Sequence, residues 1–533
     1  MFSALGIFLF GLVKLQSVAW NNNVEMNTAQ QLLFNTRAAF KSGITLPVEW
    51  RIEQLNRLLD LLNENENALL DALHKDLRKP KLESIETELI VVKNEAINAI
   101  KNVQTWSKPT YPSKAFVQMI DSVYILKEPY GVVLVMSAWN YPIQIIFSQL
   151  VGIIASGNCA IIKPSELSPV TSELMSKLIP QYLDKECFRV YLGGIPETTV
   201  LLKERFDMIM YTGSSMVGKI VMKAAAEHLT PVILELGGKS PVYVHKDSDL
   251  KLVAKRVVWG KFLNLGQTCT APDYILCHNN VVDSLIDELR KTVEEYFGSD
   301  PKESPDLARI VNARNFKRIE SIMSATPKEK LAVGGETDES ALYIAPTVYK
   351  DIQLGDPIME GEIFGPILPV LAVNGADEAV EIINSQEKPL ALYIFAKSDK
   401  VGLNFLWDEI LKMYEPGSPW SIPNLFEIVI KCITFNNILV FPYLTSQHLL
   451  VVQQLLSCTS SGGVTVNDVL MHAASHNLPF GGVGNSGMGR YHGKYTFDAL
   501  THEKPVVYRG QNFESLLSAR YPPYSEKNLS MVS

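Results

Sequence analysis

The sequence predicts an α/β fold in which mostly parallel sheets are covered by helices. Short, continuously apolar segments rich in β-branched residues are typical of strands that are buried on both faces. Such segments lie at 130–136, 160–162, 188–192 and 208–211. Helix-like segments separate them, at 141–155, 171–183 and 198–204. This alternation is the pattern of strand–helix–strand units in a parallel sheet.

The rest of the chain continues this pattern on both sides. Residues 26–100 carry leucines at helical intervals with polar residues between them, which predicts helices. A second α/β region begins near 231, with strands at 232–234 and 242–244 and a helix near 250–261. A chain of 533 residues has room for several domains of roughly 100–200 residues each.

Composition excludes several classes of protein. Hydrophobic residues make up 47% of the chain and charged residues 20%, a balance that favours a folded globular protein over a disordered one. The formal net charge is -8, without a basic block, so we expect no nucleic-acid partner. The six cysteines form no C-x-x-C pair, which argues against a zinc site or a disulfide framework. We therefore expect free thiols, no metal and a reducing, cytoplasmic location.

Two segments depart from the regular pattern. The first residues are apolar but lack a basic start, so 1–25 is interpreted as an N-terminal extension, with a secretory signal as the alternative. Residues 401–450 show no α/β rhythm, and the apolar stretch 425–444 within them contains Glu427 and Lys431. Charges near the centre of a bilayer cost roughly 2.5–3.5 kcal/mol each, which favours an insertion over a membrane span.

Three residues occupy positions where catalysis can take place. Cys269 lies in the segment GQTCTA, whose small or polar neighbours leave a thiol open to a carbonyl, and we expect a strand-to-loop setting. Glu235 ends an apolar strand before two glycines, where poor solvation can raise the pKa of a carboxyl and make it a base. Asn140 follows the first buried strand, and its amide can donate to an oxyanion. Each of these residues, taken alone, is more often structural.

A second group of residues suits a nucleotide. The segment 211–218 follows a strand and opens a helix, and backbone N–H groups at such a helix start can hold a pyrophosphate. The segment is not G-x-G-x-x-G, so the common dinucleotide fingerprint is absent. Lys163 and Glu166 follow the second strand, where a carboxylate can bind ribose hydroxyls.

Together these segments resemble motifs of the aldehyde dehydrogenase superfamily. They occur in the order of that family: AWNYP at 138–142, KPSE at 163–166, TGS at 212–214, ELGGK at 235–239, GQTC at 266–269, EIFGP at 362–366 and PFGG at 479–482. The resemblance covers roughly 26–400 and 450–523, with a helix at 450–456 where the pattern resumes. It is closest to the class 3 branch and, within that branch, to the 3B subgroup.

The resemblance implies an aldehyde dehydrogenase-like fold: a Rossmann-type cofactor domain, an α/β catalytic domain and a small oligomerisation element. The cofactor-binding domain would be 26–230, with an oligomerisation strand element near 107–128. The catalytic domain would be 231–488, interrupted by the insertion at 401–450. The last part, 489–533, would contribute to oligomerisation and form a C-terminal tail.

The resemblance also implies a role for each site residue. Cys269 matches the nucleophile, Glu235 the general base and Asn140 the oxyanion donor. Cofactor contacts are implied for Trp139, Lys163, Glu166, Gly213, Ser214, Ser215, Met216, Val217, Gly218, Glu362 and Phe364. In the implied reaction, the Cys269 thiolate adds to an aldehyde and hydride passes to a nicotinamide. Glu235 then activates water, which releases a carboxylic acid from the thioester.

Further expectations come from the class 3 branch. It implies a homodimer that takes small-molecule aldehydes, either medium- and long-chain aliphatic or aromatic. NAD or NADP is implied as the cofactor, and Glu166 favours NAD because its charge would repel a 2′-phosphate. The chain ends without a cysteine, so prenylation is not available, and membrane association is left open.

Two other interpretations fit the same residues. The insertion could impair catalysis and leave a nucleotide- or partner-binding homologue. Alternatively, Cys269 could serve a thiol esterase that needs no cofactor. For the insertion itself, we favour the hypothesis that 401–450 is sequence normally removed from the message, and the alternative is a membrane- or partner-binding element.

Overall fold

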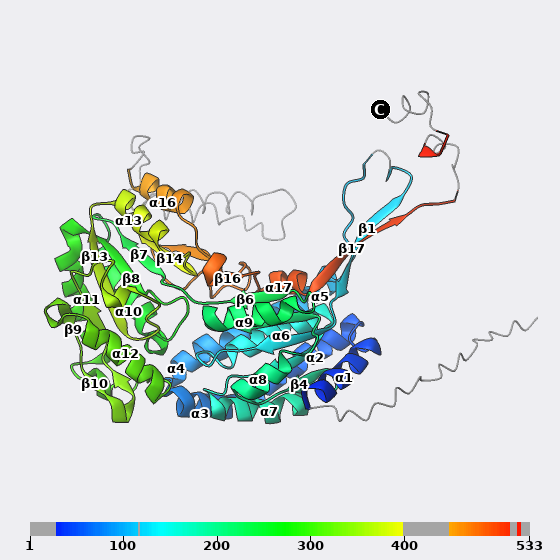
Figure 1. The fold of residues 1–533 in the computed structure, drawn as a ribbon, viewed down its shortest axis with the longest axis horizontal. Coiled ribbons are helices and arrows are strands. Elements are labelled where there is room, and N and C mark those ends of the chain that lie inside the picture. Colours follow the sequence, from blue (N-terminus) through cyan, green and yellow to red (C-terminus); the bar gives the residue numbers. More distant parts are fainter. Residues whose placement is uncertain (1–27, 116–117, 398–446, 512–519, 524–533) are drawn as a thin grey trace, which may run out of the picture.

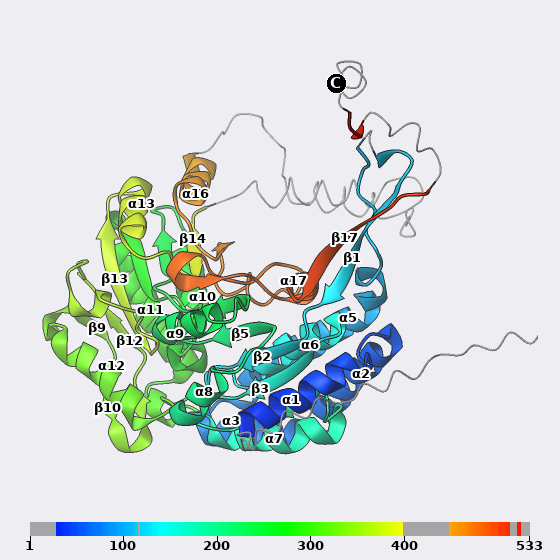
Figure 2. The same ribbon diagram turned by 45° about the vertical axis from the view of Figure 1, so that its right-hand side comes forward.

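The computed structural model describes residues 28–115, 118–397, 447–511 and 520–523. The N-terminal extension and most of the expected insertion lie outside the described residues. The described chain forms two lobes, each built on one sheet, and a two-stranded arm that projects from the body (Figures 1 and 2).

The first lobe is built on a six-stranded sheet with the order β16-β6-β5-β2-β3-β4. Its strands are β2 (Val132–Met136), β3 (Cys159–Lys163), β4 (Phe188–Val190), β5 (Met208–Thr212), β6 (Val232–Glu235) and β16 (Gly487–Met488). The strands β2 to β6 pair in parallel, and β16 pairs antiparallel with β6. Every residue of β2, β3 and β5 is buried, which confirms the strands predicted from the apolar runs.

Helices surround this sheet, as the alternation predicts. Four of them connect or follow its strands: α6 (Gln144–Ser156), α7 (Pro169–Tyr182), α8 (Ile195–Leu201) and α9 (Ser215–Ala226). The helices that come before or after them in the chain are α1 (Thr28–Lys41), α2 (Val48–Glu64), α3 (Glu66–Leu77), α4 (Lys81–Ser84), α5 (Val91–Trp106) and α17 (Gly493–Ala499). Between α4 and α5 runs a π-helical turn, η1 (Ile85–Ile90). The helical prediction for 26–100 is thereby confirmed.

The strand order of the first sheet reverses between β2 and β5. From β2 the chain moves outward to β3 and β4, then returns to add β5 and β6 on the other side. In parallel sheets of this kind, ligands bind outside the carboxyl ends of the strands at the point of reversal. The segments that follow β2 and β5 meet there, and they carry Asn140 and Gly213.

The second lobe is built on a seven-stranded sheet with the order β15-β14-β7-β8-β13-β12-β9. Its strands are β7 (Pro241–Val244), β8 (Tyr274–His278), β9 (Leu331–Val333), β12 (Thr347–Tyr349), β13 (Ile367–Val373), β14 (Ala391–Phe395) and β15 (Gly463–Val466). Its helices are α10 (Leu250–Phe262), α11 (Val282–Phe297), α12 (Ala313–Ala325), α13 (Ala376–Ser385) and α16 (Gln447–Cys458). The helix α16 confirms that a helix resumes after the insertion.

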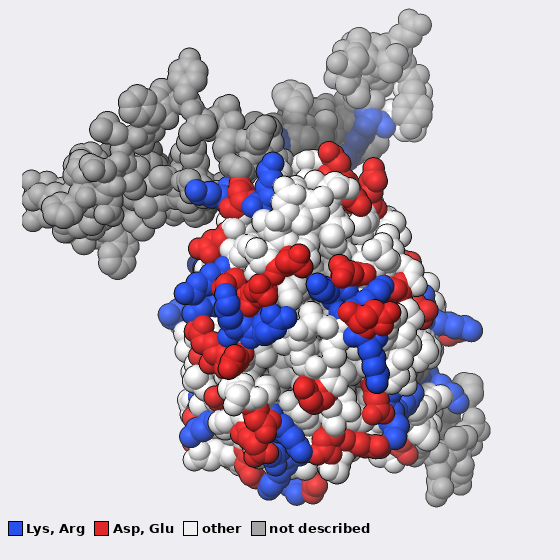
Figure 3. Space-filling model, turned by 90° about the vertical axis from the view of Figure 1, so that its left-hand side faces the viewer, with Lys and Arg blue, Asp and Glu red and all other residues white. Residues whose placement is uncertain are grey.

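On the face shown in Figure 3, acidic and basic side chains are interspersed.

The division between the sheets differs from the predicted boundary after residue 230. The strand β6 follows that boundary, but it pairs with β5, with Leu234 opposite Tyr211. The sequence gives no sign of this pairing, because the strands of both sheets are similarly apolar and either sheet could bury β6. Glu235 therefore belongs to the sheet of the first lobe.

The projecting arm consists of β1 (Ser122–Pro129) and β17 (Thr501–Tyr508), which pair antiparallel along their whole length. Figure 1 shows it leaving the body beside α5 and α17. The strand element expected near 107–128 overlaps β1. Among the described residues, no helix is both long enough and apolar enough to cross a bilayer.

Candidate active site

The candidate site residues come from two sheet edges that face each other. At the carboxyl edge of the first sheet, at or just after the ends of β2, β3, β5 and β6, lie Asn140, Lys163, Gly213 and Glu235. At the amino edge of the second sheet, Cys269 precedes β8 and Glu362 precedes β13. The expected strand-to-loop setting of Cys269 is wrong. The thiol lies in a loop between α10 and β8, because α10 ends in a left-handed turn that redirects the chain.

Glu235 and Cys269 interact across the two edges. The Glu235 side chain is only 3% exposed. Burial raises its pKa to about 8, although the interaction with the thiol lowers it. Burial also raises the pKa of Cys269 well above its usual value, and the charges of Glu235 and Glu362 add to this effect. A carboxyl that ionises near neutral pH and touches a thiol can accept the thiol proton.

The amide of Asn140 lies against the Cys269 loop. Its Nδ2 donates to the carbonyl oxygen of Gln267 at 3.0 Å, and the second N–H of that nitrogen stays available for another acceptor. The Gln267 side chain is held in turn, because its Nε2 donates to the carbonyl oxygens of Asn264 and Arg309, both at 3.0 Å. A fixed amide donor therefore lies beside the loop of the thiol, as oxyanion stabilisation requires.

Three buried tyrosines lie near the thiol. Tyr141, Tyr393 and Tyr491 are buried and interact electrostatically with Cys269. The hydroxyl of Tyr393 donates to the carbonyl oxygen of Thr270 at 2.5 Å. This hydrogen bond keeps Thr270, the residue after the thiol, in place, and the three rings add apolar surface near the reacting centre.

The turn between β5 and α9 has the form expected of a phosphate site. It is formed by Gly213, Ser214, Ser215, Met216, Val217 and Gly218. The Ser214 hydroxyl caps α9 by accepting from the Val217 N–H at 3.4 Å. A Cβ at Gly213 would lie 2.3 Å from the Tyr211 hydroxyl oxygen, and one at Gly218 would lie 2.8 Å from Leu236. A side chain at either position would force its neighbour to move, and the helix start offers its N–H groups to an anion.

Lys163 and Glu166 are brought together at the end of β3. Lys163 Nζ lies 2.6 Å from Glu166 Oε2, and the side chains are 7% and 43% exposed. Partial burial of Glu166 opposes its ionisation, but the bond to Lys163 prevails and lowers its pKa. The carboxylate is thus held charged at a partly open position, where it can accept from ribose hydroxyls.

Glu362 and Phe364 reach the site from the second lobe. A Cβ at Gly237 would lie 2.0 Å from Glu362 Oε2, so this carboxyl packs directly on the loop after β6. Burial raises the pKa of Glu362 to about 8. Phe364 meets Trp139 edge-on, with ring centroids 5.5 Å apart. Asp273 holds this segment, since its Oδ1 accepts from the N–H of Ile363 at 3.1 Å.

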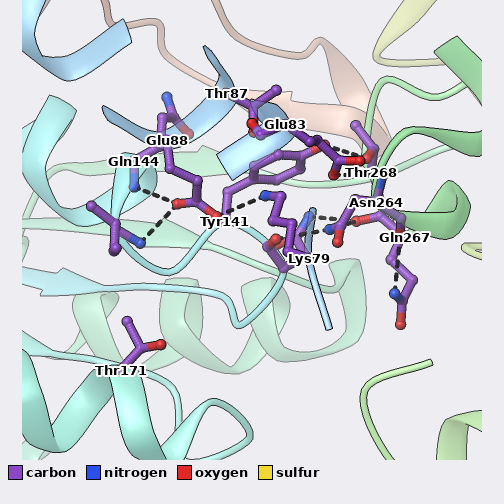
Figure 4. A network of polar contacts seen from close by, with 12 residues as sticks. Lys79, Glu83, Thr87, Glu88, Tyr141, Gln144, Thr171, Asn264, Gln267 and Thr268 are labelled. Atoms are coloured by element: carbon purple, nitrogen blue, oxygen red, sulfur yellow. Dashed lines mark hydrogen bonds and ion pairs between the residues drawn. The ribbon is translucent and has the colours of Figure 1, made fainter. Parts of the chain in front are cut away.

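The structure also shows a polar network that the sequence did not predict (Figure 4). It includes Lys79, Glu83 and Glu88, which lie far before Cys269 in the chain. Their only signal is a group of charges in a segment with helical periodicity, and such a group is usually a solvated helix face. Lys79 and Glu88 are instead buried next to Tyr141.

The sequence matches a known family over most of its length. The sequence profile of the aldehyde dehydrogenase family matches residues 16–407 and 443–506. The chain belongs to the aldehyde dehydrogenase family. The unmatched stretch, 408–442, falls within the expected insertion at 401–450, which supports its interpretation as an addition to the family's fold.

Curated relatives confirm the class 3 branch. The mouse protein named aldehyde dehydrogenase family 3 member A2 is 42% identical over 501 residues, covering 94% of this chain and 93% of the relative. Human aldehyde dehydrogenase family 3 member B1 is 42% identical over 507 residues, covering 95% and 97%. The mouse aldehyde dehydrogenase named dimeric and NADP-preferring is 43% identical over 502 residues, covering 94% and 99%. Identity is thus similar for A and B members.

Solved structures confirm the fold. The substrate-bound AldH of Staphylococcus aureus superposes with a TM-score of 0.83 at 38% identity, covering 95% of this chain and 99% of that one. The Bacillus cereus aldehyde dehydrogenase in its NAD+ complex shares the fold, with a TM-score of 0.74 at 23% identity over 90% and 88% of the chains. As a family member, this chain is an NAD(P)-dependent oxidoreductase that acts on aldehydes.

Proposed function

We propose that the chain oxidises medium- and long-chain aliphatic or aromatic aldehydes, including lipid-derived ones, to carboxylic acids. Cys269 is the nucleophile, Glu235 the general base and Asn140 the oxyanion donor. The observation that carries this proposal is the contact between the Glu235 carboxyl and the Cys269 thiol, next to the Asn140 amide. The buried tyrosines near Cys269 support an apolar substrate, and the resemblance to the class 3 branch implies the same choice.

The residues act in two stages. First, the Glu235 carboxylate accepts the thiol proton, and the Cys269 sulfur adds to the aldehyde carbon. The resulting thiohemiacetal oxyanion accepts a hydrogen bond from Asn140. Loss of hydride from the carbon leaves a thioester, and Glu235 releases its proton to solvent. Second, Glu235 removes a proton from the attacking water, so that the acid leaves and the thiol is restored.

The described residues fit a nicotinamide dinucleotide. A bound cofactor of this kind supplies the hydride acceptor. Its diphosphate would be held by the turn at 213–218, where Gly213 and Gly218 add no side chain to the backbone. Lys163 and Glu166 would hold the adenosine ribose, and Glu362, Phe364 and Trp139 the nicotinamide side. The charge of Glu166 favours NAD, and the relative named NADP-preferring keeps NADP as the second cofactor.

The arm supports a homodimer. An isolated two-stranded ribbon is marginally stable in water, yet β1 and β17 project from the body with Val507 52% and Tyr508 69% exposed. A second subunit would cover these side chains, and one relative is named dimeric.

A cytoplasmic location is supported by the free thiols of the described cysteines, which suit a reducing compartment.

The proposal is tested by the absorbance of reduced cofactor, with purified protein, NAD or NADP, and aldehydes from benzaldehyde to hexadecanal. We expect turnover in the wild type and none in Cys269→Ala. Absence of turnover in a folded wild type that still binds NAD would favour the impaired homologue. Hydrolysis of an activated ester without cofactor, in the absence of aldehyde oxidation, would favour the thiol esterase.

A further inference from the structure

A fully buried ion pair lies next to the active-site loop (Figure 4). Lys79 Nζ is 2.8 Å from Glu88 Oε1, and both side chains are 0% exposed. Transfer of two charges out of water is repaid only when further bonds complete the site. The other contacts of this pair therefore indicate what it does.

Both members of the pair contact the segment that follows Asn140. Glu88 Oε2 accepts from the backbone N–H groups of Ile143 at 3.0 Å and Gln144 at 2.9 Å. Lys79 Nζ lies 3.8 Å from the centre of the Tyr141 ring, within the range of a cation–π interaction. The pair thus fixes the chain between Asn140 and the start of α6.

Glu83 contacts the turn that leads to Cys269. Its Oε1 accepts from the backbone N–H of Asn264 at 2.9 Å. Asn264, Leu265 and Gly266 have φ values of 50°, 52° and 75°, and two non-glycine residues in the left-handed region store strain. This strained turn leads directly to Cys269. The Glu83 carboxylate therefore stabilises the loop at its strained residue Asn264.

The segment around Asn140 and the loop that leads to Cys269 are also bonded to each other. Asn264 Nδ2 donates to the carbonyl oxygen of Asn140 at 2.8 Å. The Tyr141 hydroxyl lies 2.7 Å from the Thr268 hydroxyl, one residue before the nucleophile. The oxyanion donor and the nucleophile loop are therefore parts of one network, and Figure 4 shows it gathered around the Tyr141 ring.

The local helix geometry brings the two carboxylates to this network. Residues five apart in an α-helix are separated by about 140° around the axis. Glu83 and Glu88 are five apart, and the π-helical turn η1 begins between them. Hydrogen bonds of the i→i+5 type bring such residues closer to the same face, and π-helical turns occur frequently at functional sites.

We propose that Lys79, Glu83 and Glu88 are positioning residues that fix the Asn140 amide and the Cys269 loop in the geometry needed to stabilise the oxyanion. This role rests on the proposed function. All three act through neighbours, because Glu83 contacts Asn264 while Lys79 and Glu88 contact Tyr141, Ile143 and Gln144. Glu83 gives the sharpest test, since one backbone N–H links it to the loop.

The test compares Glu83→Leu, Glu83→Gln and the wild type, with Glu86→Gln as an exposed control in the same segment. Glu83→Leu removes the acceptor for Asn264 and should lower kcat/KM for the aldehyde by about 100-fold, the scale of a misplaced reacting group. The loss should appear in kcat, with the KM for NAD unchanged. Glu83→Gln keeps an oxygen acceptor and should restore most of the rate. Equal losses in Leu and Gln, or no loss in Leu, would overturn the proposal.

A readout without turnover separates this proposal from the proposed function. The rate at which iodoacetamide alkylates Cys269 can be followed by peptide mass spectrometry. This rate should differ several-fold from the wild-type rate in Glu83→Leu and return to the wild-type rate in Glu83→Gln. The exposed thiol of Cys458 is the internal reference and should not change. A wild type that oxidises no aldehyde but shows this Cys269 pattern would refute the function and retain the positioning role. Aldehyde oxidation with unchanged Cys269 alkylation and unchanged kcat in all variants would support the proposed function and refute the positioning role.

A second variant covers the case in which Glu83→Leu does not fold. The double variant Lys79→Met/Glu88→Gln removes both charges of the pair and the cation on the Tyr141 ring, and it keeps an oxygen acceptor near Ile143 and Gln144. It should fold, with an unchanged Tm, and lose kcat/KM for the aldehyde. Wild-type kcat/KM in this folded double variant would overturn the role of the ion pair.

Discussion

At the scale of single residues, the chemistry depends on the burial of Glu235. A carboxyl with an ordinary pKa would be fully ionised at neutral pH and would be a weak base. Burial raises the pKa of Glu235 to about 8. Only part of the population is then ionised at pH 7, but the ionised form is a stronger base. Because the base form increases with pH, water activation should become faster as the pH rises through about 8.

This predicts the pH dependence of turnover. Under conditions where thioester hydrolysis limits the rate, kcat of the wild type should rise with pH, reach half of its maximum near pH 8 and level off above that pH. Glu235→Gln keeps the shape of the side chain and removes the base. The value of kcat should therefore fall by roughly 10²–10⁴-fold, and kcat should no longer rise with pH. Steady-state kcat from pH 6 to 10 is the measurement, with exposed Glu227→Gln as the control. The same pH profile in Glu235→Gln and in the wild type would contradict the assignment of the base.

Cofactor preference depends on another carboxylate. Glu166 is held ionised by Lys163 and is 43% exposed, so it should oppose a 2′-phosphate. Glu166→Gln should therefore raise the ratio of kcat/KM for NADP to that for NAD by about tenfold, or roughly 1.4 kcal/mol. The exposed Glu173→Gln on α7 is the matched control and should leave the ratio unchanged. An unchanged ratio in Glu166→Gln would place the 2′ position away from this carboxylate.

At the scale of elements, the sequence predicts strands and helices better than their partners. The apolar runs of β2, β3 and β5 identify buried strands, because side chains on both faces of these strands are covered. The sheet that β6 joins is not visible in its sequence, since an apolar strand suits either sheet. The turn at Asn264 and Leu265 is hidden for another reason: non-glycine residues rarely take positive φ, and contacts with residues distant in the chain, Glu83 and Asn140, help to sustain it. The Glu83–Asn264 contact spans much of the chain and leaves no local pattern.

The arm gives a prediction at this scale. If Val507 packs against a second subunit, Val507→Arg should weaken the homodimer by about 100-fold, as for a buried contact at an interface. Val507→Thr keeps a β-branched side chain suited to the strand and is the matched control. Light scattering over a dilution series measures the dissociation. A Val507→Arg protein that remains dimeric at all concentrations would show that the arm does not form the interface.

At the scale of the whole molecule, the active site depends on two sheets that face each other. Cys269 and Glu362 lie at the amino edge of the second sheet, before β8 and β13. The insertion is attached elsewhere, because it follows β14, and β14 runs parallel to β7. Its first attachment point is therefore at the carboxyl edge, on the side of the sheet away from the thiol. This topology explains how the site residues can come together in a chain whose match to the family is interrupted.

The same topology predicts the effect of removing the insertion. Deletion of 408–442, the stretch that the family profile does not match, spares α16, whose Leu455 is buried in the second lobe. A shorter connection changes the loop-closure entropy little, by about 0.6 kcal/mol per halving of length. Soluble yield should therefore rise, and kcat/KM should equal or exceed that of the full chain. Cys269→Ala in the shortened chain should abolish this turnover. A folded deletion variant with lower kcat/KM would mean that 408–442 contributes to activity, and the hypothesis that it is sequence normally removed from the message would fail.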